Sequence, residues 1–257
     1  MAEARENKSL RDSNVFQVAD LPPGRVPIKA RWVYKTKSSG LLKARAVLKG
    51  YMQIFGFDYN ETYSPTAKLA VYRIMLSIAA QLSLCMKTTD VNTAFLNAYL
   101  HDTDIYCIPA PGMDQPPKGK VFKVVKALYG LKQAPKEWND LLREFFLKHN
   151  FKQLKTEECL FLRISSNGHF ILVLVWVDDI LEFALSQEEQ DLFYKQLKSN
   201  FSVKENVEAS TIIGIDILRC SDGGVFLSQS KYIDSILNTL RIMASSITDL
   251  SIIHRQH

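Results

Sequence analysis

The apolar residues of this chain recur with the period of a helix in some segments and of a strand in others, which predicts a mixed α+β fold. Helical spacing is clearest in residues 68–84. We expect the buried face of this helix to run through Ala70, Ile74 and Ile78. A second helix is predicted over residues 135–149. Its apolar stripe consists of Trp138, Leu141, Leu142, Phe145 and Phe146.

Capping and turn residues mark the other elements. Ser186 and Glu189 form a capping box that opens a helix ending near Asn200, and a last helix begins near Ser230. Alternating segments bounded by turn residues predict a basic hairpin early in the chain and a second hairpin late in it. A short helix is predicted at residues 93–99. The predicted strands cover residues 30–37, 42–49, 87–90, 121–125, 211–218 and 225–228.

A run of eight apolar residues, 170–177, ends in two adjacent aspartates, Asp178 and Asp179. The run is rich in β-branched residues, as is typical of a buried central strand. Burying a carboxylate costs several kcal/mol unless a partner compensates, so the pair calls for a counter-charge, most simply a divalent metal. Asp90 follows another apolar stretch. One isolated aspartate with a later pair on a β-hairpin is the carboxylate set of a nucleotide-polymerising palm.

The order of elements after Asp90 indicates how the sheet is built. Strand, helix, paired strands, helix and strands follow one another, which fits a split β-α-β sheet with helices on one face. Residues 1–27 are polar and end in a Leu-Pro-Pro-Gly turn, so we expect them to form a peripheral N-terminal arm.

Length and composition agree with an intracellular globular protein. The chain has 257 residues, of which 47% are hydrophobic, enough for a substantial core. No apolar run approaches the ~20 residues that cross a bilayer, and the polar first twelve residues do not resemble a secretory signal. The four cysteines lie far apart without CxxC spacing, which is typical of reduced thiols rather than a zinc site.

The net charge of +5 is distributed unevenly. Residues 1–50 carry eleven Lys or Arg against four acids, and residues 118–155 carry ten against three. Residues 178–222 hold ten acids against four bases. Two basic segments around an acidic centre would suit a nucleic-acid track beside a metal site, although ordinary solvated lysines are the alternative.

Six blocks in order resemble the reverse transcriptase domain of copia-type LTR retrotransposons, from about residue 16 to 240. The blocks are residues 43–50 (KARAVLKG), 57–65 (FDYNETYSP), 89–97 (TDVNTAFLN), 126–135 (KALYGLKQAP), 176–179 (WVDD) and 227–233 (LSQSKYI). The resemblance implies a right-hand polymerase with fingers at about 28–85 and 107–135, a palm at about 86–106 and 136–240, and a divergent tail, 241–257.

The resemblance also implies roles for single residues. Asp90, Asp178 and Asp179 would be the catalytic residues and the ligands of two Mg²⁺ ions, with Mn²⁺ as an alternative. Nucleotide binding would involve Arg45, Phe95, Tyr129, Gly130 and Gln133, with Phe95 as a steric gate against ribonucleotides. Nucleic-acid binding would involve Lys43, Lys49, Lys132 and Trp176. The partners would be an RNA template, a DNA or tRNA primer and deoxynucleoside triphosphates, in the cytoplasm and without a membrane.

Four positions depart from the family pattern. Trp176 replaces the usual Tyr, Asn92 replaces the usual Lys, Ala184 stands where Gly is expected, and Glu182 occupies an ordinarily apolar position. An extra buried acid would weaken the hairpin by a few kcal/mol. Two other readings therefore stay open. One is an inactive retroelement-derived fragment, inert or only nucleic-acid-binding, and the other is an unrelated palm enzyme such as a nucleotidyl cyclase. The sequence leaves the oligomeric state open.

Overall fold

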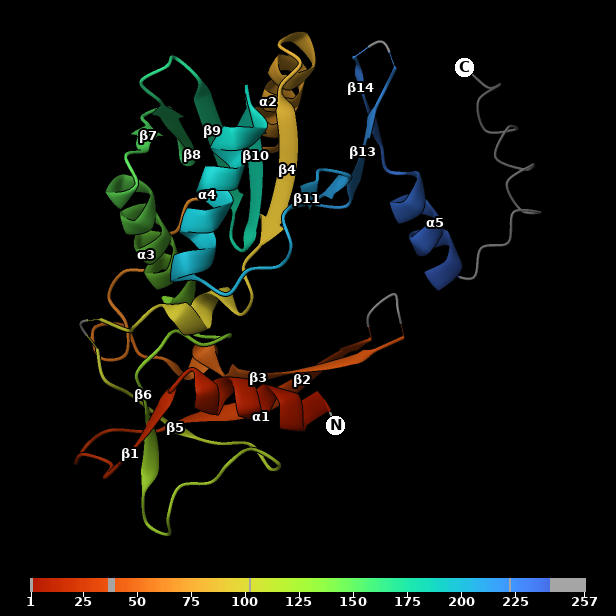
Figure 1. The fold of residues 1–257 in the computed structure, drawn as a ribbon. Coiled ribbons are helices and arrows are strands. Elements are labelled where there is room, and N and C mark those ends of the chain that lie inside the picture. Colours follow the sequence, from red (N-terminus) through yellow and green to blue (C-terminus); the bar gives the residue numbers. More distant parts are fainter. Residues whose placement is uncertain (1, 37–39, 102, 222, 241–257) are drawn as a thin grey trace, which may run out of the picture.

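The computed structural model describes residues 2–36, 40–101, 103–221 and 223–240 (Figure 1). Helices and strands are mixed along the chain, which confirms the predicted α+β class. The predicted tail, 241–257, lies outside the described residues. The helices are α1 (Ala2–Asp12), α2 (Leu69–Gln81), α3 (Ala134–Lys148), α4 (Gln187–Asn200) and α5 (Ser230–Thr239), with short 3₁₀ helices at Gly50–Met52 and Ala94–Asn97.

A six-stranded sheet carries the aspartate pair. Its strands follow the order β11-β4-β10-β9-β8-β7, and every neighbouring pair is antiparallel. The central strand β9 coincides with the apolar run predicted from the sequence. The strands are β4 (Cys85–Asp90), β7 (Lys152–Leu154), β8 (Glu157–Ile164), β9 (Phe170–Trp176), β10 (Asp179–Ala184) and β11 (Val207–Glu208).

Helices cover both faces of this sheet, so the expectation of helices on one face only is wrong. On one face, Phe146 of α3 and Phe193 of α4 belong to the same buried cluster as Val173 of β9. On the other face, Tyr72 of α2 is clustered with Leu174. Figure 1 shows α4 in front of the sheet and α2 behind it. Alternate residues of β9 point to opposite faces, and an apolar run along the whole strand therefore requires a cover on each side.

The buried stripe of α2 also differs from the predicted one. The residues that pack on the sheet are Tyr72, Met75, Leu76 and Ala79. Ile74, which was expected to face inward, is 57% exposed. This helix is apolar around most of its circumference, so helical spacing alone selects more than one possible inward face.

A five-stranded sheet forms the lower body in Figure 1. The order is β1-β6-β5-β2-β3, and β2 pairs with β3 as the predicted basic hairpin. Most of its turn, residues 37–39, lies outside the described residues. The strands are β1 (Phe16–Ala19), β2 (Ile28–Thr36), β3 (Leu42–Leu48), β5 (Ile105–Ile108) and β6 (Val121–Val124).

The first 27 residues are built into this sheet rather than forming a peripheral arm. Strand β1 pairs with β6, and Leu10 and Val15 are buried in the main core. Helix α1 lies along the open edge of β3, where the Glu6 carboxylate accepts a hydrogen bond from the amide of Ala46 at 3.1 Å. The segment is polar overall, so its composition did not predict that these few apolar residues would pack it against the core.

A small third sheet and α5 complete the described chain. Its order is β12-β13-β14, and β13 and β14 form the predicted late hairpin. The strands are β12 (Thr211–Ile212), β13 (Ile215–Arg219) and β14 (Val225–Ser228). In the described part of the chain, every helix is too short or too polar to cross a membrane.

Candidate active site

Asp178 and Asp179 lie at the tight turn between β9 and β10. Val177 has a φ of +57°, a left-handed conformation that is costly for a β-branched residue. Two hydrogen bonds fix the turn. The Trp138 indole donates to the carbonyl of Val177 at 2.7 Å, and the amide of Val91 donates to the carbonyl of Asp178 at 3.0 Å. The turn is therefore held by α3 on one side and by the residue after Asp90 on the other.

The strand register brings the three aspartates to one edge of the sheet. Asp179 is the direct partner of Asp90 on β4, across an antiparallel ladder. Burial and the neighbouring carboxylates of Asp178 and Asp90 together raise the pKa of Asp179 to about 6, and Lys204 opposes this rise. Asp179 therefore lies within electrostatic reach of both other carboxylates.

Lys204 is a member of this site that the sequence interpretation missed. Its Nζ lies 2.6 Å from Oδ2 of Asp90, and its amide donates to the Asp90 carbonyl at 2.9 Å. The segment around Lys204 lies beside Asn92, whose main-chain N–H donates to the carbonyl of Ser202 at 2.8 Å. Lys204 therefore places a positive charge beside Asp90 from a segment that is distant in the sequence. No local sequence signal links positions 114 residues apart.

A divalent cation fits the chemistry of these donors. Carboxylate oxygens are the hard ligands that Mg²⁺ prefers, and a cation would offset both the burial and the neighbouring negative charge that raise the pKa of Asp179. Within the described residues, no three His, Cys, Asp or Glu side chains form a ready-made ligand group. The aspartates thus offer an open carboxylate edge, and further ligands would have to come from water or substrate phosphates.

Three of the predicted nucleotide-binding residues form a continuous stack. The guanidinium carbon of Arg45 lies 4.7 Å from the centre of the Tyr129 ring, and the Phe95 ring meets Tyr129 edge-on at 4.9 Å. Burial raises the pKa of the Tyr129 phenol, the Arg45 charge opposes this, and the Asp178 carboxylate adds to it. The stack therefore runs from the basic hairpin to within electrostatic reach of Asp178.

Gly130 makes a close approach, but to the protein backbone. A Cβ at this position would lie 2.0 Å from the carbonyl oxygen of Leu48, and φ is +93°. The neighbouring Tyr129 carbonyl accepts a hydrogen bond from the Leu48 amide at 2.9 Å. Packing against β3 therefore accounts for glycine at this position, whether or not a nucleotide also contacts it.

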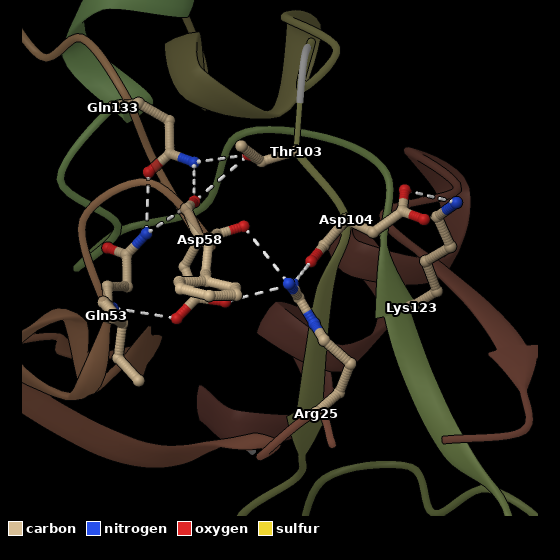
Figure 2. A network of polar contacts seen from close by, with 9 residues as sticks. Arg25, Gln53, Asp58, Thr103, Asp104, Lys123 and Gln133 are labelled. Atoms are coloured by element: carbon tan, nitrogen blue, oxygen red, sulfur yellow. Dashed lines mark hydrogen bonds and ion pairs between the residues drawn. The ribbon is translucent and has the colours of Figure 1, made fainter. Parts of the chain in front are cut away.

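Gln133 has a structural role rather than the predicted nucleotide contact. It is 3% exposed, and both ends of its amide are bonded inside the protein (Figure 2). Its oxygen accepts from Gln53 at 2.8 Å, and its nitrogen donates to the Asp58 carbonyl at 2.9 Å. Arg25 joins the same network through an ion pair with Asp58 at 3.1 Å. A buried amide satisfied in this way holds the loops together and is not available to a ligand.

The four predicted nucleic-acid contacts lie in different surroundings. Lys132 is exposed and donates to the Tyr59 hydroxyl at 3.0 Å, with its Nζ 4.4 Å from the centre of that ring. Lys43 is exposed on β3, and Lys49 is half-buried. Trp176 is half-buried against Tyr72 of α2, opposite Asp179 in the sheet. Trp176 therefore lies beside Asp179 in the sheet, with its ring packed on α2.

Glu182 is completely buried on β10, three residues after Asp179. Its Oε1 accepts hydrogen bonds from the Thr89 hydroxyl at 3.0 Å and from the Asn206 amide at 2.6 Å. Burial outweighs these bonds and raises the pKa of Glu182 to about 8. Glu182 is therefore mainly protonated at pH 7 in the folded chain. Folding at this pH requires the carboxylate to take up a proton, which lowers the free energy of unfolding.

We expect Glu182→Gln to raise the free energy of unfolding by about 3 kcal/mol at pH 7. The pKa of Glu182 is higher in the folded state than its ordinary 4.5, so unfolding releases a proton between these values. Stability of the wild type should then fall as pH rises from about 5 to 8, whereas the two proteins should be alike below about pH 4.5. Urea unfolding across this range measures the slope, and the exposed Glu144→Gln should keep it. An unchanged slope in Glu182→Gln would contradict the buried neutral acid.

Comparison with known proteins identifies the family of this chain. Residues 13–253 match the family described as reverse transcriptase (RNA-dependent DNA polymerase), and the chain belongs to that family. A solved foamy viral protease–reverse transcriptase in complex with double-stranded DNA covers 89% of this chain and 35% of its own, with a TM-score of 0.45 and 16% identity.

Within the family, the chain is similar to Pol polyproteins of plant retrotransposons. It is 34% identical over 246 residues to the retrovirus-related Pol polyprotein from transposon TNT 1-94 of Nicotiana tabacum. It is 38% identical over 247 residues to the Pol polyprotein from transposon RE1 of Arabidopsis thaliana. Each match covers 92% of this chain, which spans only 18% and 16% of these two polyproteins.

Proposed function

We propose that this chain is an RNA-directed DNA polymerase domain that adds deoxynucleotides to a primer on an RNA template. The observation that carries the proposal is the pairing of Asp179 with Asp90 across the sheet, beside Asp178. In the reaction, the primer 3′-oxygen attacks the α-phosphorus of the triphosphate, and the bond to the pyrophosphate oxygen breaks. Two bound Mg²⁺ or Mn²⁺ ions would neutralise the charge on the attacking and leaving oxygens.

The chain's own residues would orient the reactants. Asp90, Asp178 and Asp179 would hold the ions, and Arg45 would bind the triphosphate through its planar guanidinium. Lys43, Lys49 and Lys132 would contact the backbone of the RNA template and of the DNA or tRNA primer, and Trp176 would border the primer end. Retrotransposon relatives support an intracellular setting, and we place the reaction in the cytoplasm.

Phe95 would exclude ribonucleotides. Its ring is half-buried and held edge-on by Tyr129, so it has a fixed position within the stack, and Tyr129 lies within electrostatic reach of Asp178. We expect Phe95→Ala to reduce the preference for deoxynucleotides over ribonucleotides by roughly tenfold, about 1.4 kcal/mol, because the steric clash is removed. Phe95→Tyr keeps the ring and should keep the preference. Single-nucleotide incorporation of dTTP and UTP measures it, and equal selectivity in all three proteins would remove the gate role.

Primer extension on a poly(rA)/oligo(dT) substrate tests the function directly. Extension that requires Mg²⁺ or Mn²⁺ and stops on addition of EDTA is the expected result. The alternative is a retroelement-derived remnant that has lost catalysis, which the departures at Glu182 and Trp176 favour. A folded chain that binds the substrate in a gel shift without extending it would support that alternative.

A further inference from the structure

The loop from Ser202 to Asn206 fixes the position of Lys204 against β4. Val203 forms an isolated antiparallel bridge with Val91, and the amide of Lys204 donates to the carbonyl of Asp90 at 2.9 Å. Two residues on, Asn206 donates to the Thr89 hydroxyl at 2.7 Å and to Glu182 at 2.6 Å. Contacts on both sides therefore hold the Lys204 backbone beside the catalytic strand, which makes its ion pair with Asp90 a feature of the fold.

The side chain itself remains able to move. The Lys204 side chain is 59% exposed, whereas that of Asp90 is 32% exposed. A cavity of about 310 Å³ adjoins the pair, and Asp90, Asp179, Lys204 and Glu205 are among the residues that line it. The Lys204 ammonium thus has both solvent and open space beside it. It could move away from Asp90 without its charge becoming buried.

We propose that Lys204 is the internal counter-ion of Asp90, a positioning residue that occupies this carboxylate until a divalent cation displaces it. The inference rests on the proposed function, because it assumes that Asp90 is a metal ligand. An ammonium 2.6 Å from Oδ2 lies within the space that a cation bound to that oxygen would need. Before metal binds, the ion pair offsets part of the repulsion among the three aspartates. When metal binds, releasing the pair lowers the apparent affinity.

A titration of the whole chain with Mn²⁺ measures this competition without substrate. The electron paramagnetic resonance signal of the free ion reports how much Mn²⁺ is unbound. An exposed ion pair is a weak one, so Lys204→Met should tighten Mn²⁺ binding by roughly two- to fivefold. Lys204→Arg keeps the charge and should bind like the wild type. Lys195→Met removes one exposed lysine from α4, which controls for the change in net charge, and should also bind like the wild type. Asp178→Asn should weaken binding, which locates the ion.

Thermal unfolding gives a second readout. In EDTA, Lys204→Met should unfold at a lower temperature than the wild type because the aspartate repulsion is uncompensated. Saturating Mn²⁺ should close that gap, whereas loss of an ordinary packing contact would leave it open. Unchanged or weaker Mn²⁺ binding in Lys204→Met, or a wild type that binds no Mn²⁺, would overturn the proposal. Primer extension tests the polymerase function separately. A chain in which Mn²⁺ competes with Lys204 for Asp90, but which does not extend a primer, would contradict the proposed function and leave the role of Lys204 standing.

Discussion

Asp178→Asn is expected to reduce primer extension by a factor of roughly 10³ or more while leaving the chain folded. Asparagine has the same shape as aspartate but lacks its charge, so it cannot neutralise a bound cation. The turn should survive, because its hydrogen bonds involve main-chain carbonyls of Val177 and Asp178 rather than the aspartate side chain. Single-turnover extension at saturating Mg²⁺ measures the rate, and circular dichroism with thermal unfolding verifies the fold.

Asp20→Asn provides the matched control. The Asp20 side chain is 80% exposed near the end of β1, where it pairs with Lys120 on the surface. Removing the same charge there should leave extension unchanged, since exposed ion pairs contribute little. Extension by Asp178→Asn at the wild-type rate would contradict the site assignment at Asp90, Asp178 and Asp179. Loss of extension in both variants would point to a general effect of charge instead.

The hairpin that carries the aspartate pair was predictable because its signal is local. An apolar strand that ends in two aspartates specifies a buried hairpin with carboxylates at its tip, and the structure forms β9, a tight turn and β10 at those residues. Asp90 was singled out in the same way, after another apolar stretch, and the antiparallel register pairs it with Asp179. Burial pattern and motif order were sufficient here because neither depends on how distant loops pack.

Contacts made by distant polar residues were not predictable. Lys204 lies in a loop that reads as an ordinary charged connection, and its partner Asp90 is specified only by the pairing of that loop with β4. Gln133 belongs to a family block, but the block does not reveal that Gln53 and Asp58 enclose its amide. Side-chain partners of this kind depend on tertiary packing, which hydrophobic periodicity does not encode.

Gly130 shows the same limit in a single residue. Its motif suggested close approach of a backbone to a nucleotide, whereas the observed neighbour is the carbonyl of Leu48. A glycine signals that something lies close or that φ is positive, without saying which partner approaches. Gly50 is the reciprocal case, because a Cβ there would lie 1.9 Å from the carbonyl oxygen of Gly130. The two glycines let the end of β3 and the 129–130 segment pack backbone to backbone.

Gly130→Ala is therefore expected to lower the free energy of unfolding by about 4 kcal/mol, in the absence of any nucleotide. Two costs add at this position, the clash with the Leu48 carbonyl and the strain of a left-handed φ. Two single-cost variants separate them. Gly168→Ala has a φ of +82° with nothing within 4 Å of the new Cβ, so it should lose only about 1–2 kcal/mol. Gly50→Ala introduces the clash without a positive φ and should lose about 2–3 kcal/mol.

Urea unfolding of the four proteins measures these differences, and the order of stability carries the argument. If the wild type is most stable, Gly168→Ala next, Gly50→Ala third and Gly130→Ala least, packing against β3 explains the glycine. If Gly130→Ala is as stable as Gly168→Ala, the backbone contact with Leu48 is not tight. In that case, a loss of dNTP affinity in Gly130→Ala without loss of stability would return this glycine to the nucleotide-binding role that its motif predicted.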